Sequence, residues 1–204
     1  MEMMSGTVRS HDPRGHPMRS VIVTEFVSLD GVMEAPGGDE NFRHAGWTFD
    51  IETDDTMYAY KFDEANEAGA LLLGRRTYDG FAASWPERDG AFADRFNDMP
   101  KYVVSSTLTD PEWNNTTVLP DVDAVATLRD GDGGPLVVQG SAQLVHELHR
   151  RGLVDEWRLM VWPVILGSGK RIFPDDVEDK AKLELVASTT YANGVQLQTF
   201  RPAV

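Results

Sequence analysis

Short apolar runs alternate with amphipathic stretches along most of the chain. The apolar or β-rich runs have the length of strands and lie at residues 21–28, 70–74, 101–105, 116–119, 135–139 and 156–166. Helices are predicted between them, at residues 54–68, 89–97 and 121–128 and again from Ser141 to Gly152. Wholly apolar runs such as residues 70–74 (ALLLG) are typical of buried parallel strands. The alternation therefore predicts an α/β protein.

The end of the chain differs from the part that precedes it. Residues 183–190 and the alternating residues 195–200 flank Asn193-Gly194, which is a strong signal for a two-residue hairpin turn. An antiparallel hairpin after βα units predicts a mixed, mostly parallel sheet flanked by helices in three layers. We expect one domain over residues 18–204. Residues 1–17 show no periodicity, and we expect them to form a disordered extension.

The composition excludes several classes of function. Asp and Glu number 33 against 19 Lys and Arg, which gives a formal net charge of −14 and disfavours binding to nucleic acid by broad phosphate neutralisation. No apolar run approaches the roughly 20 residues of a membrane-spanning helix. The chain has no cysteine, so disulfides, zinc–thiolate sites and thiol nucleophiles are excluded, and a reducing cytoplasm is the expected location.

Two glycine-containing turns lie between a buried strand and a helix, GRRT at residues 74–77 and QGSA at residues 139–142. Free N–H groups at a helix start attract anions, and glycine lets a phosphate approach closely. A third strand ends in SST at residues 105–107, whose hydroxyls can bind phosphate or ribose. Each signal alone also fits ordinary α/β construction. Together they favour one extended phosphorylated ligand across the strand ends, although the G-x-G-x-x-G fingerprint of a Rossmann domain is absent.

The motifs GRRTY at 74–78, VVSST at 103–107 and VVQGSAQL at 137–144 resemble, in this order, the dihydrofolate-reductase-like superfamily. With SLDG at 28–31 and PVILGSGKRIF at 163–173, the chain is most similar to the reductase domain of riboflavin biosynthesis (the RibD C-terminal domain) and its stand-alone relatives. The resemblance covers nearly all of residues 18–204. It implies a homodimeric reductase that binds NADPH and transfers hydride to a small planar, pterin- or pyrimidine-like substrate.

The resemblance also implies which residues bind the coenzyme. The two glycine turns match the turns that hold its phosphates, the serines match the strand end beside the 2′-phosphate, and SLDG matches the loop over the nicotinamide. The residues assigned in this way are Thr24, Asp30, Gly31, Val32, Gly74, Arg75, Arg76, Thr77, Ser105, Ser106, Gln139, Gly140, Ser141, Ala142, Gln143 and Leu144. Two arginines and two serines near one phosphate favour NADP over NAD.

The sequence leaves the proton donor and the substrate pocket open. Dihydrofolate reductases carry a carboxylate on the first helix, and the corresponding stretch, residues 53–62, offers Asp54 and Asp55. Both also suit the positive end of a helix that Thr53 can cap. Asp30 is the alternative acid, and it equally suits a turn. Because the folate pattern is not matched, a non-catalytic NADP(H)-binding or regulatory module is the alternative function. The candidates for the substrate pocket are Tyr58, Trp85 and Trp162.

Overall fold

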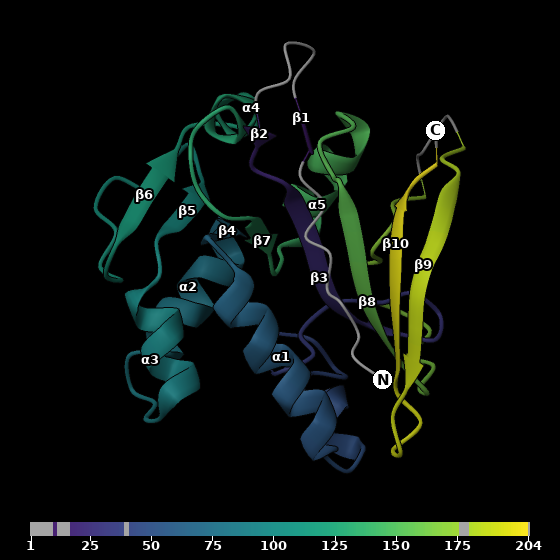
Figure 1. Cartoon of the computed structure of the whole chain (residues 1–204). Coiled ribbons are helices and arrows are strands. Elements are labelled where there is room, and N and C mark those ends of the chain that lie inside the picture. The colour runs from purple at the N-terminus through teal and green to yellow at the C-terminus, as the bar shows by residue number, and fades with distance from the viewer. Residues whose placement is uncertain (1–9, 12–16, 39–40, 176–179, 204) are drawn as a thin grey trace.

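The computed structural model describes residues 10–11, 17–38, 41–175 and 180–203 (Figure 1). Its centre is an eight-stranded sheet with the strand order β6-β5-β4-β7-β3-β8-β10-β9. The parallel strands are β3 (Val21–Ser28), β4 (Ala70–Gly74), β5 (Lys101–Val104), β6 (Thr116–Leu119), β7 (Leu136–Val138) and β8 (Glu156–Trp162). The antiparallel hairpin of β9 (Leu183–Thr190) and β10 (Gln196–Pro202) joins the sheet through β8.

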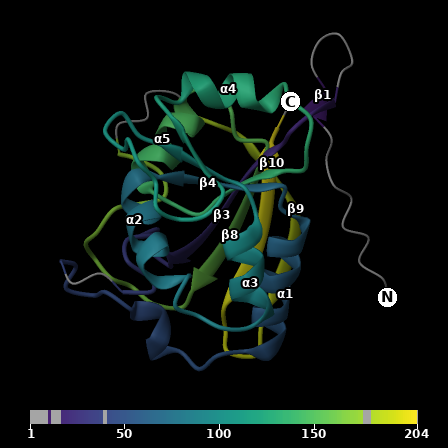
Figure 2. The same cartoon turned by 90° about the vertical axis from the view of Figure 1, so that its left-hand side faces the viewer.

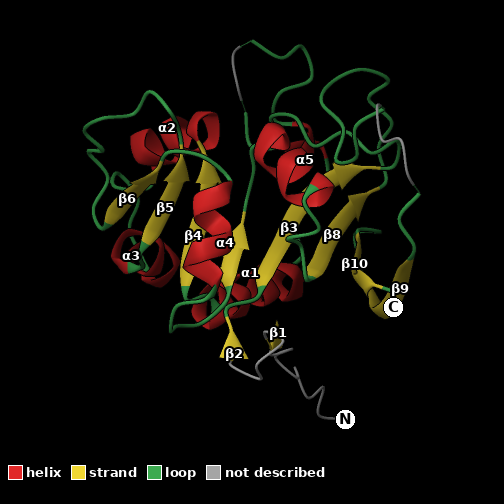
Figure 3. Cartoon of the chain, turned by 90° about the horizontal axis from the view of Figure 1, so that it is seen from above, coloured by secondary structure: helices red, strands yellow, loops and turns green. Residues whose placement is uncertain are grey.

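Helices cover both faces of the sheet (Figures 2 and 3). One face packs against α4 (Asp123–Arg129) and α5 (Ala142–Arg150), and the other against α1 (Asp55–Glu67), α2 (Arg75–Ser84) and α3 (Ala91–Asp98). Side chains of β3 alternate between these layers: Val21 and Val23 contact the α5 layer, whereas Ile22 contacts the α1 layer. The predicted three-layer α/β fold with a C-terminal hairpin is confirmed. None of the helices that the structure describes has the length and hydropathy to cross a membrane.

Three local features differ from the sequence predictions or extend them. Asp54, not Thr53, caps α1, because its carboxylate accepts from the N–H groups of Thr56 and Met57. Strand β8 ends at Trp162 rather than at residue 166, since Pro163 has no N–H for the ladder. The long loop after β3 contains a 3-10 helix, η1 (Trp47–Asp50).

The proposed extension, residues 1–17, is described only in part. Strand β1 (Ser10–His11) pairs antiparallel with β2 (Pro17–Met18). The other residues of the extension lie outside the described part of the chain, so its disorder stays a prediction.

The carboxyl ends of the parallel strands define the edge where the site is expected. Strands β3, β4, β5 and β7 run in the same direction, so residues that follow them meet at one edge of the sheet. Strand β7 is short, and its last pair with β3 joins Val138 to Val23. Strand β3 continues to Ser28. Beyond Val23 it is therefore no longer paired with β7.

Candidate coenzyme and substrate site

The two glycine turns are in direct contact with each other. The N–H of Gly74 donates to the carbonyl oxygen of Gly140 at 3.2 Å. A Cβ on Gly74 would overlap Ser141 Oγ and would lie 3.0 Å from Ser141 Cβ, and a Cβ on Gly140 would lie 2.6 Å from Thr77 Oγ1. Gly140 also has a φ of +78°, which side chains other than glycine rarely adopt. Glycine at both positions therefore lets α2 and α5 begin side by side.

This pair of helix starts has the chemistry of a phosphate site. Neither Gly74 nor Ser141 caps its helix with a side-chain hydrogen bond, so first-turn N–H groups and two helix dipoles remain to attract an anion. Arg75 is half-buried and its Nε binds both carboxylate oxygens of Asp79, at 2.8 and 3.0 Å. Arg76 is exposed. These residues fit the phosphates of a dinucleotide in charge and in the close backbone approach that the glycines allow.

The end of β5 adds hydroxyl groups next to this turn. Val104 pairs with Gly74, so Ser105 lies beside the start of α2. Its Oγ accepts from the N–H groups of Thr107 and Leu108 at 3.2 and 3.1 Å. Ser106 is exposed. The predicted serine and arginine turns are thus neighbours, although the Ser105 hydroxyl already accepts bonds from its own turn.

The other predicted coenzyme residues of the second turn differ in exposure. Ala142 and Leu144 point into the core and can offer only backbone atoms to a ligand. Gln143 is exposed and Gln139 is half-buried. The turn thus presents mainly N–H groups.

The SLDG segment is fixed to the loop that follows β8. The carboxylate of Asp30 accepts from Ser28 Oγ at 2.6 Å and from the N–H groups of Leu166 and Gly167 at 3.1 and 2.8 Å. Partial desolvation raises the pKa of Asp30, but these hydrogen bonds outweigh it and lower the pKa to about 2. Asp30 is therefore ionised at neutral pH, and its carboxylate holds two loops together.

The rest of this segment continues the same pairing. Gly31 has a φ of +82°, and its carbonyl oxygen accepts from the N–H of Ile172 at 2.9 Å. Buried Val32 forms an antiparallel bridge with Arg171. Glu34 forms an ion pair with Lys170 at 2.8 Å. The pKa of Glu34 is lowered, because bonds from Lys170 and the charges of Lys170 and Arg76 outweigh desolvation. Arg76 of the first glycine turn is thus among the charges that act on Glu34.

The two acids at the start of α1 occupy a different position. The Oδ2 of Asp54 accepts from the N–H of Ala192 in the β9–β10 turn at 3.1 Å. Hydrogen bonds, chiefly from the Thr56 hydroxyl, lower the pKa of Asp54. Asp55 is exposed in the first turn of the helix. The structure thus makes Asp54 a helix cap and a contact to the terminal hairpin.

Trp162 is the buried aromatic residue of the predicted substrate set. It is only 3% exposed and lies edge-to-face with Phe26 and Trp47, at centroid distances of 5.7 and 6.0 Å. Within the described part of the chain, its Nε1 is the buried side-chain nitrogen or oxygen that has no hydrogen-bond partner. A buried indole N–H normally has an acceptor, so this atom is a natural donor to a ligand.

Tyr58 and Trp85 belong to a second aromatic cluster. Both contact Phe92, at centroid distances of 5.6 Å, and Trp85 stacks on Phe96 at 4.3 Å. Tyr58 is 55% exposed. These rings contact Phe92 and Phe96, whereas Trp162 contacts Phe26 and Trp47, so the three predicted substrate residues fall into two groups.

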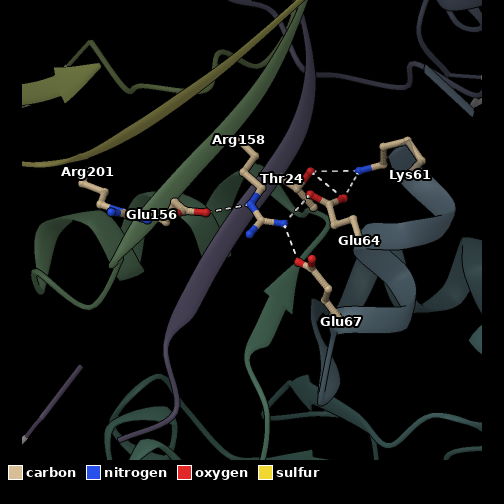
Figure 4. Close-up of polar contacts among 7 residues, drawn as sticks. All are labelled: Thr24, Lys61, Glu64, Glu67, Glu156, Arg158 and Arg201. Atoms are coloured by element: carbon tan, nitrogen blue, oxygen red, sulfur yellow. Dashed lines mark hydrogen bonds and ion pairs between the residues drawn. The ribbon is translucent and has the colours of Figure 1, made fainter. Parts of the chain in front are cut away.

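Thr24 faces α1 and not the glycine turns (Figure 4). Its hydroxyl donates to Glu64 at 3.0 Å and accepts from Lys61 Nζ at 2.8 Å, while Lys61 and Glu64 form an ion pair. The Lys61 ammonium also lies 5.6 Å from the ring centroid of Phe26. This group of polar side chains therefore lies next to the aromatic residues around Trp162.

The ion pairs continue from Glu64 to the last strand (Figure 4). Arg158 contacts Glu64 at 3.4 Å and Glu67 at 3.6 Å and binds Glu156 at 2.7 Å. Arg201 binds the same Glu156 at 2.9 Å. With Lys61, three cations face three carboxylates, so buried charge is compensated within the network. The network was not predicted from the sequence, although Lys61 and Glu64 are spaced for an ion pair on one helix face.

Glu25 is a further acid that the sequence analysis missed. It is buried, and its carboxyl accepts from the N–H of Gly140. Burial raises the pKa of Glu25 to about 8, against smaller lowering effects of this hydrogen bond and of Lys61. The available signal was an acidic residue inside the apolar run VIVTEFVS.

Comparisons with known proteins identify the family and the fold of this chain. The sequence model of the RibD C-terminal domain matches residues 19–197. The Bacillus subtilis (strain 168) protein YyaP is 28% identical over 87% of this chain and 92% of its own. A candidate riboflavin biosynthesis protein from Shewanella sp. PV-4 has a TM-score of 0.68 at 19% identity, covering 91% of this chain and 99% of that one.

A dihydrofolate reductase from Enterococcus faecalis, complexed with NADP(H) and RAB-propyl, has a TM-score of 0.59 at 16% identity. The structural match covers 91% of this chain and 97% of the reductase chain. These structures share the fold, and the resemblance found from the sequence motifs is confirmed. The chain belongs to the RibD C-terminal domain family and has the dihydrofolate-reductase-like fold.

Proposed function

We propose that this protein is an NADPH-dependent reductase of a small planar heterocycle of the pterin or pyrimidine class. The observation that carries the proposal is the contact between the two glycine turns, which sets the starts of α2 and α5 side by side at the carboxyl edge of the sheet. Membership of a reductase family and a structural neighbour that holds NADP(H) support the choice of coenzyme.

The chain's own residues divide the binding task in this proposal. First-turn N–H groups of α2 and α5 hold the pyrophosphate, and Arg75 and Arg76 bind the 2′-phosphate beside Ser105 and Ser106. The segment of Asp30, Gly31 and Val32 covers the nicotinamide end. When bound, the coenzyme supplies the hydride.

The substrate is proposed to lie against the aromatic residues around Trp162. The Trp162 N–H has no acceptor among the described residues, and it would donate to a ring nitrogen or carbonyl oxygen of the heterocycle. A buried N–H aimed at a ligand discriminates strongly against analogues that lack the acceptor. Neither Asp30 nor Asp54 suits the role of acid in this reduction, because hydrogen bonds keep both carboxylates ionised.

The coenzyme assignment is tested by replacing Arg75 and Arg76 with Ala. Charge-assisted hydrogen bonds contribute about 1.5–3 kcal/mol each, and exposure reduces this, so we expect the Kd for NADPH to rise about 10- to 100-fold. The Kd for NADH, which lacks the 2′-phosphate, should change by less than about threefold. Arg88→Ala, at an exposed arginine that lies over Trp85, is the control. Calorimetry measures the affinity of wild type, of the arginine variant and of the control for each coenzyme, and equal losses for both coenzymes would reject the 2′-phosphate assignment.

Turnover is tested separately. Stopped-flow oxidation of bound NADPH is followed with a panel of oxidised pterins, flavins and pyrimidines. Oxidation by one of these classes supports the reductase. Tight NADPH binding without oxidation by any of them would favour the alternative of a non-catalytic NADP(H)-binding module.

A further inference from the structure

Glu25 lies where β3 loses its neighbour on one side. The last pair between β3 and β7 joins Val23 to Val138, and the chain then turns away through Gln139 and Gly140. Glu25 is the second residue beyond Val23, and its carboxyl accepts from the N–H of Gly140. An acid thus occupies one of the backbone donors of the second glycine turn.

The surroundings of Glu25 do not compensate a negative charge. It is only 8% exposed. From α1, Lys61 and Glu64 act on it in opposite senses, and both already belong to the ion-pair network of Figure 4. The paired residue on β8 is apolar Leu159, and the turn before α5 presents the single N–H of Gly140. Burial therefore dominates and favours the neutral acid.

A neutral acid and a carboxylate would have opposite effects on a phosphate bound at this turn. A protonated carboxyl carries an O–H donor, whereas a carboxylate is an acceptor only. A carboxylate beside the pyrophosphate would also place like charges together in a poorly solvated site, and both effects oppose binding.

Resting on the proposed function, we propose that Glu25 is a residue of the coenzyme site that binds the dinucleotide in its neutral form, so that coenzyme binding takes up a proton. Bound phosphate shares the turn with the Glu25 O–H and withdraws that proton from exchange with solvent. In alkaline solution, where Glu25 of the coenzyme-free protein is ionised, Glu25 must take up a proton before the coenzyme can bind. The reduced and oxidised coenzymes should share this linkage, because both carry the same pyrophosphate.

Isothermal titration of NADPH in buffers of different ionisation enthalpy measures the protons taken up. Because burial raises the pKa of Glu25 to about 8, linkage predicts uptake of about 0.1 proton at pH 7, about 0.5 at pH 8 and about 0.9 at pH 9. The Kd should rise towards about tenfold per pH unit above pH 8. Glu25→Gln keeps the shape and an acceptor for the Gly140 N–H but cannot ionise. Its uptake should stay near zero, and its Kd should stay flat between about pH 7 and pH 9.

Two controls isolate the Glu25 carboxyl. Lys101, whose pKa burial lowers to about 8, titrates in the same range but is present in both proteins, so the difference between them reports Glu25 alone. Infrared spectroscopy of the free wild-type protein should show a protonated carboxyl band at pH 7 that is lost above pH 9 and is absent from Glu25→Gln. The presence of this band in the wild type and its loss above pH 9 do not depend on how well the variant folds.

The outcomes separate the two proposals. Binding with the same proton uptake in wild type and Glu25→Gln would overturn the role of Glu25 and leave the coenzyme assignment standing. Absence of the carboxyl band from the wild type at pH 7 would do the same. No NADPH binding at about pH 6, where Glu25 is neutral, would overturn the proposed function and this inference with it.

Discussion

Replacement of Gly74 by Ala tests whether the contact between the two glycine turns builds the site. Gly74 has φ −77° and ψ 157°, which alanine adopts freely. Any effect must therefore come from the new methyl group and not from the backbone. That methyl would overlap Ser141 Oγ and lie 3.0 Å from Ser141 Cβ and 3.1 Å from Ser141 N.

The size of the effect follows from these distances. Rotation of the Ser141 side chain relieves the overlap with Oγ, but the Cβ and the backbone nitrogen must move by a few tenths of an ångström. Overpacking of this kind costs about 1–3 kcal/mol of the free energy of unfolding. Because the start of α5 moves away from that of α2, the Kd for NADPH should rise at least about tenfold as well.

Gly80 supplies a matched control in the same helix. A Cβ there meets nothing within 4 Å, so Gly80→Ala should stabilise the protein by about 0.5–1 kcal/mol and leave the Kd unchanged. Ser141→Gly removes the overlapped side chain. The double variant Gly74→Ala/Ser141→Gly should therefore recover about 1–2 kcal/mol relative to the sum of the single changes.

Urea unfolding measures the free energies, and calorimetry with NADPH measures the Kd. If Gly74→Ala matched the wild type in both, the two turns would not pack as described. If Gly74→Ala lost stability and the double variant Gly74→Ala/Ser141→Gly recovered none of it, the residue that the new methyl group meets would not be Ser141.

Two further predictions concern buried and capping groups. Lys101 is fully buried, and its ammonium donates to the carbonyl oxygens of Asn97, Met99 and Asn114 at 2.8, 2.8 and 2.9 Å. Lys101→Met should lower the free energy of unfolding in urea by about 3 kcal/mol or more, because it leaves these acceptors without a donor. A similar loss on replacing the exposed Lys182 by Met would contradict this. Asp54→Ala should lower Tm by roughly 2–4 °C while Asp54→Ser, which still caps, should not; equal Tm values together with loss of NADPH oxidation in both would instead restore Asp54 as a catalytic acid.

The sequence predicted most of the fold because its signals are local. The short run ALLLG, bounded by glycines, is typical of a buried strand, and the Asn193-Gly194 turn sets the terminal hairpin. The glycine turns were placed correctly for the same reason, since each lies between a strand and a helix. What the sequence could not supply is which turns touch. The contact of Gly74 with Ser141 depends on β4 and β7 being neighbours, and their sequence order does not reveal that.

The missed residues depend on the direction of side chains in β3. Thr24 and Glu25 are adjacent in sequence, yet one binds Glu64 on α1 and the other binds the turn before α5. The choice between the two faces is fixed by register with β7 and β8. The role of Glu25 depends in addition on where β7 ends, which no local pattern marked. Trp162 could be named as a substrate candidate, but its unsatisfied N–H emerges only from the packing around it.

The ion-pair network can be completed only late in synthesis of the chain. Arg201, near the end of the chain, holds Glu156, which in turn holds Arg158 beside Glu64. While β10 is still inside the exit tunnel of the ribosome, the folded part of the nascent chain lacks both this arginine and the antiparallel strand that pairs with β8. The ion-pair network next to Thr24 then lacks one of its three positive charges. Strand β3, the first strand of the eight-stranded sheet in sequence, therefore has a complete polar face only after β10 has emerged.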